Sequence, residues 1–220
     1  MIKTHLKFLI FSIFSMIILN SCSTSPSHII IMCAGDSITE SAYPRFLQRI
    51  CKKEGIKAKV LNYGRNGNNS EEYLVYLNQN KKVMSENYPD FILIQLGTND
   101  IRMDHDRTST EKFYKNMKNI IKIFHTFKNR SGDATKLLLA TIPPVPEGVS
   151  YPFSEESRIR VTTEINPIIE KICTEEKIFL VDNYSLFLKF PQLLPEIHPS
   201  KEGYKYLAQN WFDALEIFIK

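Results

Sequence analysis

Five short apolar runs, separated by longer amphipathic segments, constrain the fold of this 220-residue chain more than any other feature. The runs consist mainly of aliphatic residues, as buried strands do, and they cover residues 28–33, 58–63, 91–96, 137–142 and 178–181. Strands that alternate with helices form a parallel sheet covered on both faces. The sequence therefore predicts an α/β fold, a three-layer α/β/α sandwich around a five-stranded parallel sheet.

The segments between these runs carry apolar residues three or four positions apart, which predicts helices with one buried face. The expected helices begin at residues 43, 70, 108, 157 and 201. The fourth extends to residue 176 and contains Pro167, which predicts a kink or interruption because proline lacks an amide hydrogen. Ser70 is a candidate N-cap of the second helix, and Ser200 of the last.

The N-terminal segment is predicted to lie outside this domain. Lys3 and Lys7 precede the apolar run of residues 8–19, which is short for a membrane span and is typical of a secretory signal. An uncleaved membrane anchor is the alternative. We therefore expect a signal peptide at residues 1–21 and one domain at residues 28–220.

Cys22 follows Leu19-Asn20-Ser21, a pattern that resembles a bacterial lipobox. In proteins with that motif the chain is cut before the cysteine, and the cysteine carries the lipid. Residues 22–27 then form a flexible tether. The expectation is an exported bacterial lipoprotein, anchored to a membrane on its periplasmic or cell-surface side.

Charge and cysteine usage restrict the possible partners. The formal net charge is only +4, and two of the lysines lie in the signal segment, so nothing favours nucleic acid binding.

Cys33, Cys51 and Cys173 lie in apolar runs without a CxxC pair or a Cys/His cluster. Buried free thiols are thus expected rather than a metal site or disulfides. No oligomeric state is predicted.

Polar or glycine-rich residues follow several of the predicted strands. Ser37 follows the first, Gly67 the second and Asn99 the third, whereas His198 lies in the loop after the last. Each has a plain structural explanation when taken alone, as a turn residue, a cap or a surface histidine. Because parallel strands present their carboxyl ends at one edge of the sheet, we expect the four to converge.

Together these residues supply the parts that acyl transfer requires. A nucleophile, an adjacent base and donors aimed at the developing oxyanion are needed. Ser37 is the candidate nucleophile and His198 the candidate base. The amides of Ser37 and Gly67 and the side-chain amide of Asn99 are the candidate oxyanion donors. Glycine suits its position because a side chain would keep substrate away from the backbone N–H.

The order of these motifs resembles that of the SGNH (GDSL-type) hydrolases over essentially the whole mature chain. The matching blocks are Gly35-Asp36-Ser37-Ile38-Thr39, Gly67, Gly97-Thr98-Asn99-Asp100 and His198-Pro199. The resemblance implies a flavodoxin-like fold, ester hydrolysis and no metal or cofactor. It also implies the same roles for Ser37, Gly67, Asn99 and His198.

The chain departs from that family at the acidic member of the triad. The family places an aspartate three residues before the histidine, where this chain has Pro195. Three interpretations stay open. Glu196, two residues before His198, orients the ring; a backbone carbonyl does so, leaving a Ser–His dyad; or the site only binds. Glu196 is our first choice as the third catalytic residue.

The substrate is predicted by family analogy alone. The blocks and Thr141-Ile142-Pro143-Pro144 look most like the branch with carbohydrate deacetylases, which implies acetyl esters of glycans. A lipase, lysophospholipase or thioesterase is the alternative, since residues 184–194 form an apolar segment before His198. We expect that segment to cover the sheet as a turn or short helix. A glycan-binding lipoprotein without turnover and an acyltransferase complete the alternatives.

Overall fold

The structure is a computed structural model, and it describes residues 28–219. The expected signal peptide, Cys22 and the tether lie outside the described residues. Five parallel strands form one sheet in the order β2-β1-β3-β4-β5. This is the strand order of flavodoxin-like folds, so the predicted architecture is confirmed.

The strands coincide closely with the predicted runs. They are listed in chain order as β1 (Ile29–Gly35), β2 (Ala58–Gly64), β3 (Phe91–Gln95), β4 (Lys136–Ala140) and β5 (Phe179–Val181). β3 is buried along its whole length because helices cover both of its faces. Gly35 at the end of β1 pairs with Gly64 of β2 and Gln95 of β3, so these three strands end at one level.

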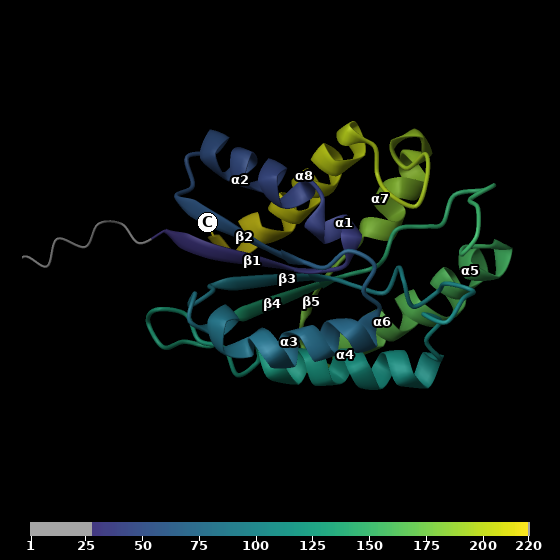
Figure 1. The fold of residues 1–220 in the computed structure, drawn as a ribbon. Coiled ribbons are helices and arrows are strands. Elements are labelled where there is room, and N and C mark those ends of the chain that lie inside the picture. The colour runs from purple at the N-terminus through teal and green to yellow at the C-terminus, as the bar shows by residue number, and fades with distance from the viewer. Residues whose placement is uncertain (1–27, 220) are drawn as a thin grey trace, which may run out of the picture.

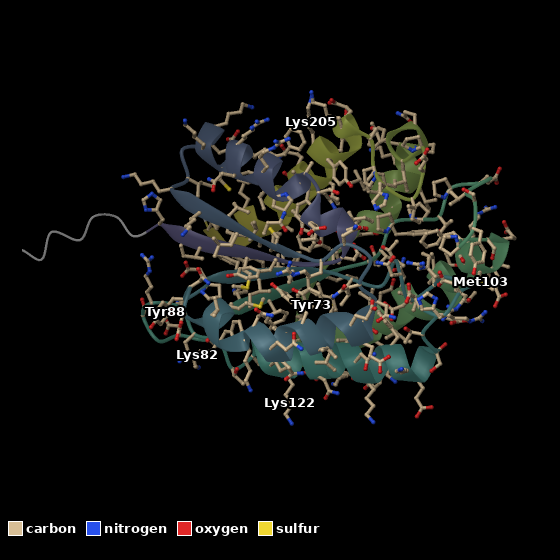
Figure 2. The ribbon with its side chains drawn as sticks, in the orientation of Figure 1. Tyr73, Lys82, Tyr88, Met103, Lys122 and Lys205 are labelled. Carbon is tan, nitrogen blue, oxygen red and sulfur yellow. The ribbon has the colours of Figure 1, made fainter. Side chains whose placement is uncertain are left out.

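Helices cover the two faces of the sheet (Figure 1). α2 (Tyr43–Lys53) and α8 (Lys201–Ile219) lie on one face, and α3 (Ser70–Ser85), α4 (Thr110–Phe124) and α6 (Asn166–Glu176) lie on the other. Each face has its own apolar core, one centred on Trp211 of α8 and the other on Phe113 and Phe124 of α4. Tyr73 points inward from α3, whereas Lys122 points away from α4 into solvent (Figure 2).

Short helices gather where the strands end, on the right in Figure 1. They are α1 (Ser37–Glu40), α5 (Glu155–Arg160), α7 (Asn183–Lys189) and the 3₁₀ turn η2 (Pro191–Leu193). The apolar segment at residues 184–194 is therefore a short helix and a turn, as expected, with Phe187, Leu193 and Leu194 buried. α1 was not predicted, because four residues are too few to show a helical period.

The helix expected over residues 157–176 is interrupted close to Pro167, as predicted. α5 leads into a π-helical turn, Val161–Ile165, before α6 begins. The amide of Asn166 donates to the carbonyl of Val161, five residues back, directly before Pro167. Proline lacks the amide hydrogen that a regular turn would use, so the irregular turn lies next to it.

Of the two predicted helix caps, the one on α3 is wrong and the one on α8 is confirmed. Asn69, not Ser70, caps α3, and Glu72 completes a capping box. Ser200 does cap α8, since its hydroxyl accepts from the amide of Gly203 at 3.1 Å.

Cys33, Cys51 and Cys173 are buried free thiols, as predicted. Among residues 28–219, no helix is long and apolar enough to cross a membrane.

Candidate active site

Ser37 lies at the first turn beyond β1, on the edge of the sheet where the strands end. Asp36 caps α1 by accepting from the amide of Ile38 at 3.0 Å, so Ser37 begins the helix directly after the bend. Gly35 makes the bend possible, because a Cβ there would lie 2.0 Å from the carbonyl oxygen of Gln95. The structure thus holds Ser37 in a tight strand-to-helix turn against β3.

His198 meets Ser37 across 161 residues of sequence. Its Nε2 lies 2.8 Å from the Oγ of Ser37, which is hydrogen-bond distance for a nucleophile and its base. The surrounding loop, residues 194–200, is called the histidine loop below. It is fastened to η2 by a bond from the amide of Ser200 to the carbonyl of Leu193, 2.9 Å long. The two residues predicted as nucleophile and base are therefore in contact.

The pKa of His198 is lowered from its usual value. The first cause is desolvation of the ring, and the negative charge of Glu196 acts in the opposite direction. A lowered pKa keeps the imidazole neutral at neutral pH. A neutral imidazole is the form that can accept the proton of Ser37.

Gly67 lies in the loop between β2 and α3. The amide of Asn68 donates to the carbonyl of Arg65 at 3.2 Å, and Gly67 has a positive φ of 77° inside that turn. Such a φ is adopted most readily by glycine. Within the described part of the chain, the amides of Ser37 and Gly67 donate to no other protein group. Both amides therefore stay available as donors to a ligand.

Asn99 connects its own loop to the loop that carries Gly67. Its side chain is buried, and Nδ2 donates to the carbonyl of Asn68 at 2.9 Å. An amide nitrogen has two hydrogens, so the second stays free to donate to an oxyanion. This single contact fixes two of the predicted oxyanion donors relative to each other.

A buried polar network lies directly behind Asn99. The carboxylate of Asp100 accepts from the amide of Ser70 at 2.9 Å and from its hydroxyl at 2.6 Å. Asn116 of α4 donates to that hydroxyl at 3.0 Å, and Arg160 donates to the carbonyl of Asp100 at 2.9 Å. Asp100 therefore joins the start of α3 to the loop after β3.

Sequence reasoning did not find this network. In the sequence, Asp100 is only the last residue of the Gly97-Thr98-Asn99-Asp100 block, and Ser70 is only a candidate cap. The sequence signal is an aspartate close to a buried strand, between Asn99 and Ile101, because a carboxylate that becomes buried requires a partner. The identity of that partner, 30 residues earlier, depends on the fold.

Two carboxyl groups close to the site have raised pKa values. Burial raises the pKa of Asp36, next to Ser37, to about 7, and the hydrogen bond from Ile38 opposes the shift. Burial likewise raises the pKa of Asp100 to about 6, against the effect of Ser70. Raised carboxyl pKa values of this kind gather at functional sites.

Glu196 does not contact His198. Among the described residues, no hydrogen bond or ion pair within 4.0 Å joins the two side chains, and Nδ1 of His198 has no protein partner. Glu196 is exposed, and Pro195 before it is exposed too. Neither the expected contact with Glu196 nor a backbone carbonyl bonded to Nδ1 is present among the described residues, so the contact with Ser37 is the one hydrogen bond of the His198 ring. A catalytic role for Glu196 stays a prediction. In this geometry Glu196 affects His198 only through its negative charge, which raises the pKa of the imidazole.

A large apolar cavity opens at the same edge of the sheet. Its volume is about 550 Å³, and it lies between the loop after β4, α5, α7 and η2. Its apolar lining includes Pro144, Val145, Phe187, Leu188 and Leu194. Leu194 belongs to the histidine loop, whereas neither Ser37 nor His198 lines the cavity.

The tyrosines and the arginine closest in sequence to the site loops divide into two groups. Tyr43 and Tyr73 are fully buried, and Tyr43 stacks near Trp211, so both are packing residues. Arg65 and Tyr76 lie nearer the surface, with the guanidinium 4.0 Å from the ring centre. These two form an accessible polar and aromatic pair beside the Gly67 turn.

Comparison with known proteins agrees with this geometry. Residues 33–206 match the family described as GDSL-like Lipase/Acylhydrolase. The chain belongs to this family, and its predicted enzyme class, a hydrolase of ester bonds, is confirmed at the level of the family. No cluster of three or more His, Cys, Asp or Glu side chains suited to a metal occurs within residues 28–219.

One curated relative and two solved structures illustrate the similarity. A multidomain esterase of Ruminococcus flavefaciens is 24% identical over 135 residues, covering 60% of this chain but only 16% of that protein. A lipase/acylhydrolase from Enterococcus faecalis has a TM-score of 0.71 at 22% identity, covering 87% of this chain and 97% of that one. An acetyl xylan esterase has a TM-score of 0.66 at 21% identity, covering 85% of this chain and 100% of that one. At these identities the two structures show the common fold.

Proposed function

We propose that this chain hydrolyses acetyl and other short acyl esters of carbohydrates through an acyl-enzyme. The observation that carries the proposal is the 2.8 Å contact between Ser37 Oγ and His198 Nε2, beside the open amides of Ser37 and Gly67. The family supports ester hydrolysis, and the similarity to an acetyl xylan esterase supports a glycan ester.

The proposed first half-reaction forms the acyl-enzyme. Ser37 Oγ attacks the ester carbonyl carbon while its proton passes to Nε2 of His198. The carbonyl oxygen becomes an oxyanion and accepts hydrogen bonds from the amides of Ser37 and Gly67 and from Asn99. The bond to the alcohol oxygen then breaks, and His198 returns the proton to that oxygen.

The second half-reaction repeats these steps with water. His198 removes a proton from water, the hydroxide attacks the acyl carbon, and Ser37 Oγ leaves with the proton from His198. The carboxylic acid is released and the enzyme is restored. If an alcohol replaces water, the same chemistry gives acyl transfer, and only the measured products separate the two.

A second candidate function is hydrolysis of longer-chain esters, as in a lipase, lysophospholipase or thioesterase. The specific observation in its favour is the apolar cavity of about 550 Å³ beside the histidine loop. A long acyl chain could enter such a space.

A panel of p-nitrophenyl acetate, butyrate and octanoate separates the two functions. We expect kcat/KM to be highest for acetate, and acetate to be released from acetylated xylan. Activity that rises with acyl length would contradict the proposal and favour the second function. A serine-reactive fluorophosphonate probe should label the wild-type protein but not Ser37→Ala. Absence of labelling at Ser37 would favour a binding protein without turnover.

The proposal also includes export and lipid anchoring through Cys22. Its support is the sequence alone, since residues 1–27 lie outside the described part of the chain. Metabolic labelling with palmitate in a bacterial host should mark the wild-type protein and not Cys22→Ser. Equal labelling of the two would contradict anchoring at this residue.

A further inference from the structure

The cavity beside the histidine loop has the form of a ligand site rather than a packing defect. Its volume of about 550 Å³ lies within the range of roughly 300–1,000 Å³ typical of small-molecule pockets. Leu188 of α7 and Ile159 of α5 line it, and each keeps more than half of its surface exposed. Large apolar side chains are therefore presented to solvent at its opening.

One arginine and two glutamates line the cavity, so its charged groups are paired but carry one net negative charge. Arg158 lies 2.7 Å from a carboxylate oxygen of Glu155 and 3.5 Å from one of Glu147, and all three line the cavity. The remaining lining is mostly apolar. The excess of carboxylates disfavours an anion such as a phosphate, and the apolar part of the lining favours an uncharged apolar group.

The cavity lies on the histidine side of the candidate site. The segments that line it follow β4 and β5, whereas Gly67 follows β2 at the opposite end of the sheet order. Among the described residues, the Gly67 turn contributes nothing to the lining. Leu194 and Pro191 do contribute, and they lead directly into the histidine loop.

The proton that His198 returns to the leaving alcohol indicates whether the alcohol part or the acyl part of an ester lies on the cavity side. His198 must return its proton to the oxygen of the leaving alcohol, so that oxygen lies close to Nε2. The oxyanion lies on the other side, toward Gly67 and Asn99. A group attached to the alcohol oxygen is thereby directed toward the wall formed by the histidine loop and α7.

We propose that this cavity binds an apolar alkyl or aryl group carried by the alcohol part of the substrate. The inference rests on the proposed ester hydrolysis and deepens it. The preferred substrates are short acyl esters of alcohols that bear an apolar group, such as an alkyl or aryl glycoside. Selectivity for the alcohol and selectivity for a short acyl group then reside on opposite sides of Ser37.

Two isomeric esters test the assignment without a change in overall hydrophobicity. Hexyl acetate carries its apolar chain on the alcohol, and ethyl hexanoate carries the same number of carbons mainly on the acyl side. With ethyl acetate as reference, kcat/KM should rise roughly 10- to 100-fold for hexyl acetate, which corresponds to burial of about two or three of its four additional methylenes at about 0.8 kcal/mol each. It should not rise for ethyl hexanoate. Equal values for the two isomers, or a preference for ethyl hexanoate, would overturn the inference.

A matched pair of variants localises the effect. Leu188→Asp places a charge at the cavity opening and should lower the ratio of hexyl acetate to ethyl acetate activity by at least about 10-fold. Val83→Asp makes the same change at another exposed apolar residue, on α3 and outside the cavity, and should leave that ratio unchanged. An unchanged ratio in Leu188→Asp would contradict the assignment.

A binding measurement separates failure of this inference from failure of the proposed function. Saturation-transfer NMR with hexyl β-glucoside, using Ser37→Ala protein, reports contact with the alkyl chain and requires no turnover. If the wild-type enzyme hydrolyses no ester, the proposed function fails, but alkyl-chain contact that Leu188→Asp abolishes still supports the cavity. Absence of contact in Ser37→Ala, or equal contact in Ser37→Ala/Leu188→Asp, overturns the cavity assignment alone.

Discussion

The two halves of the candidate site are built in different ways. The serine side comprises Ser37, Gly67 and Asn99, and it is supported by buried, multiply bonded residues such as Asp100 and Ser70. On the histidine loop, His198 is only partly shielded from solvent, and its ring makes one hydrogen bond, to Ser37. The contrast suggests that oxyanion stabilisation depends on a rigid arrangement, whereas the base depends on one contact and on its lowered pKa.

The difference has a physical origin. Buried polar groups must be satisfied within the protein, so residues at the ends of β1 and β3 have fixed partners. A loop residue in contact with water can be hydrated instead. Substitutions on the serine side should therefore affect catalysis more than substitutions of the histidine loop outside His198. Four variants test this comparison, from the largest expected effect to the smallest.

Ser37→Ala should reduce ester hydrolysis by at least about 10⁴-fold, because no other group can form the acyl-enzyme. The measurement is kcat for p-nitrophenyl acetate, with thermal unfolding as a control for the fold. The unfolding midpoint should change little, since only one hydroxyl is removed. Retained hydrolysis at the wild-type rate would remove Ser37 from the mechanism.

Asn99→Ala should reduce kcat by roughly 100- to 1,000-fold with a smaller change in KM, because an oxyanion donor acts mainly in the transition state. The variant also removes the bond to Asn68, so the Gly67 turn loses its link to the loop after β3. Steady-state kinetics with short esters separate kcat from KM. A change confined to KM would show that Asn99 only binds the substrate.

Asp100→Asn should lower kcat roughly 10-fold, since the amide cannot accept both hydrogen bonds from Ser70 and the start of α3 would shift. Ser70→Ala keeps the backbone bond and should have a smaller effect. An unchanged kcat in Asp100→Asn would show that the network stabilises the fold without positioning Asn99.

Asp100→Asn should also change how stability depends on pH. The pKa of Asp100 is raised to about 6 by burial, so the folded state holds its proton more tightly than the unfolded state does. The free energy of unfolding of the wild type should therefore fall as pH rises from about 4 to about 7, with Asp36 contributing in the same direction. Chemical denaturation across this range should show a shallower fall in Asp100→Asn.

Glu196→Gln should have the smallest effect, less than about threefold on kcat/KM at neutral pH, because no hydrogen bond joins it to His198. Its charge raises the pKa of His198, so its removal should shift the acidic limb of the pH–rate profile to lower pH. Glu202→Gln, an exposed carboxylate change in α8, is the control. A loss near 10⁴-fold would restore Glu196 as the third catalytic residue. Substitutions in the histidine loop would then affect catalysis as strongly as those on the serine side.

The strands were predictable because burial on both faces requires continuous apolar runs, which are visible in the sequence around Ile31 and Leu93. The π-helical turn before Pro167 was only partly predictable. Proline indicates an irregularity, but the type of turn depends on how α5 and α6 pack.

The sequence by itself determined the α/β class, the family and the nucleophile–base pair Ser37 and His198, but not the acidic member of the triad. Hydrophobic period and short motifs are local properties, and they can be read one segment at a time. Only the tertiary structure decided that Asp100 is bonded to Ser70, that Glu196 misses His198, and that Leu188 faces an open cavity. Each of these depends on distances between residues far apart in the chain or on the path of one loop. Such distances follow from the packing of the whole domain, which no single segment encodes.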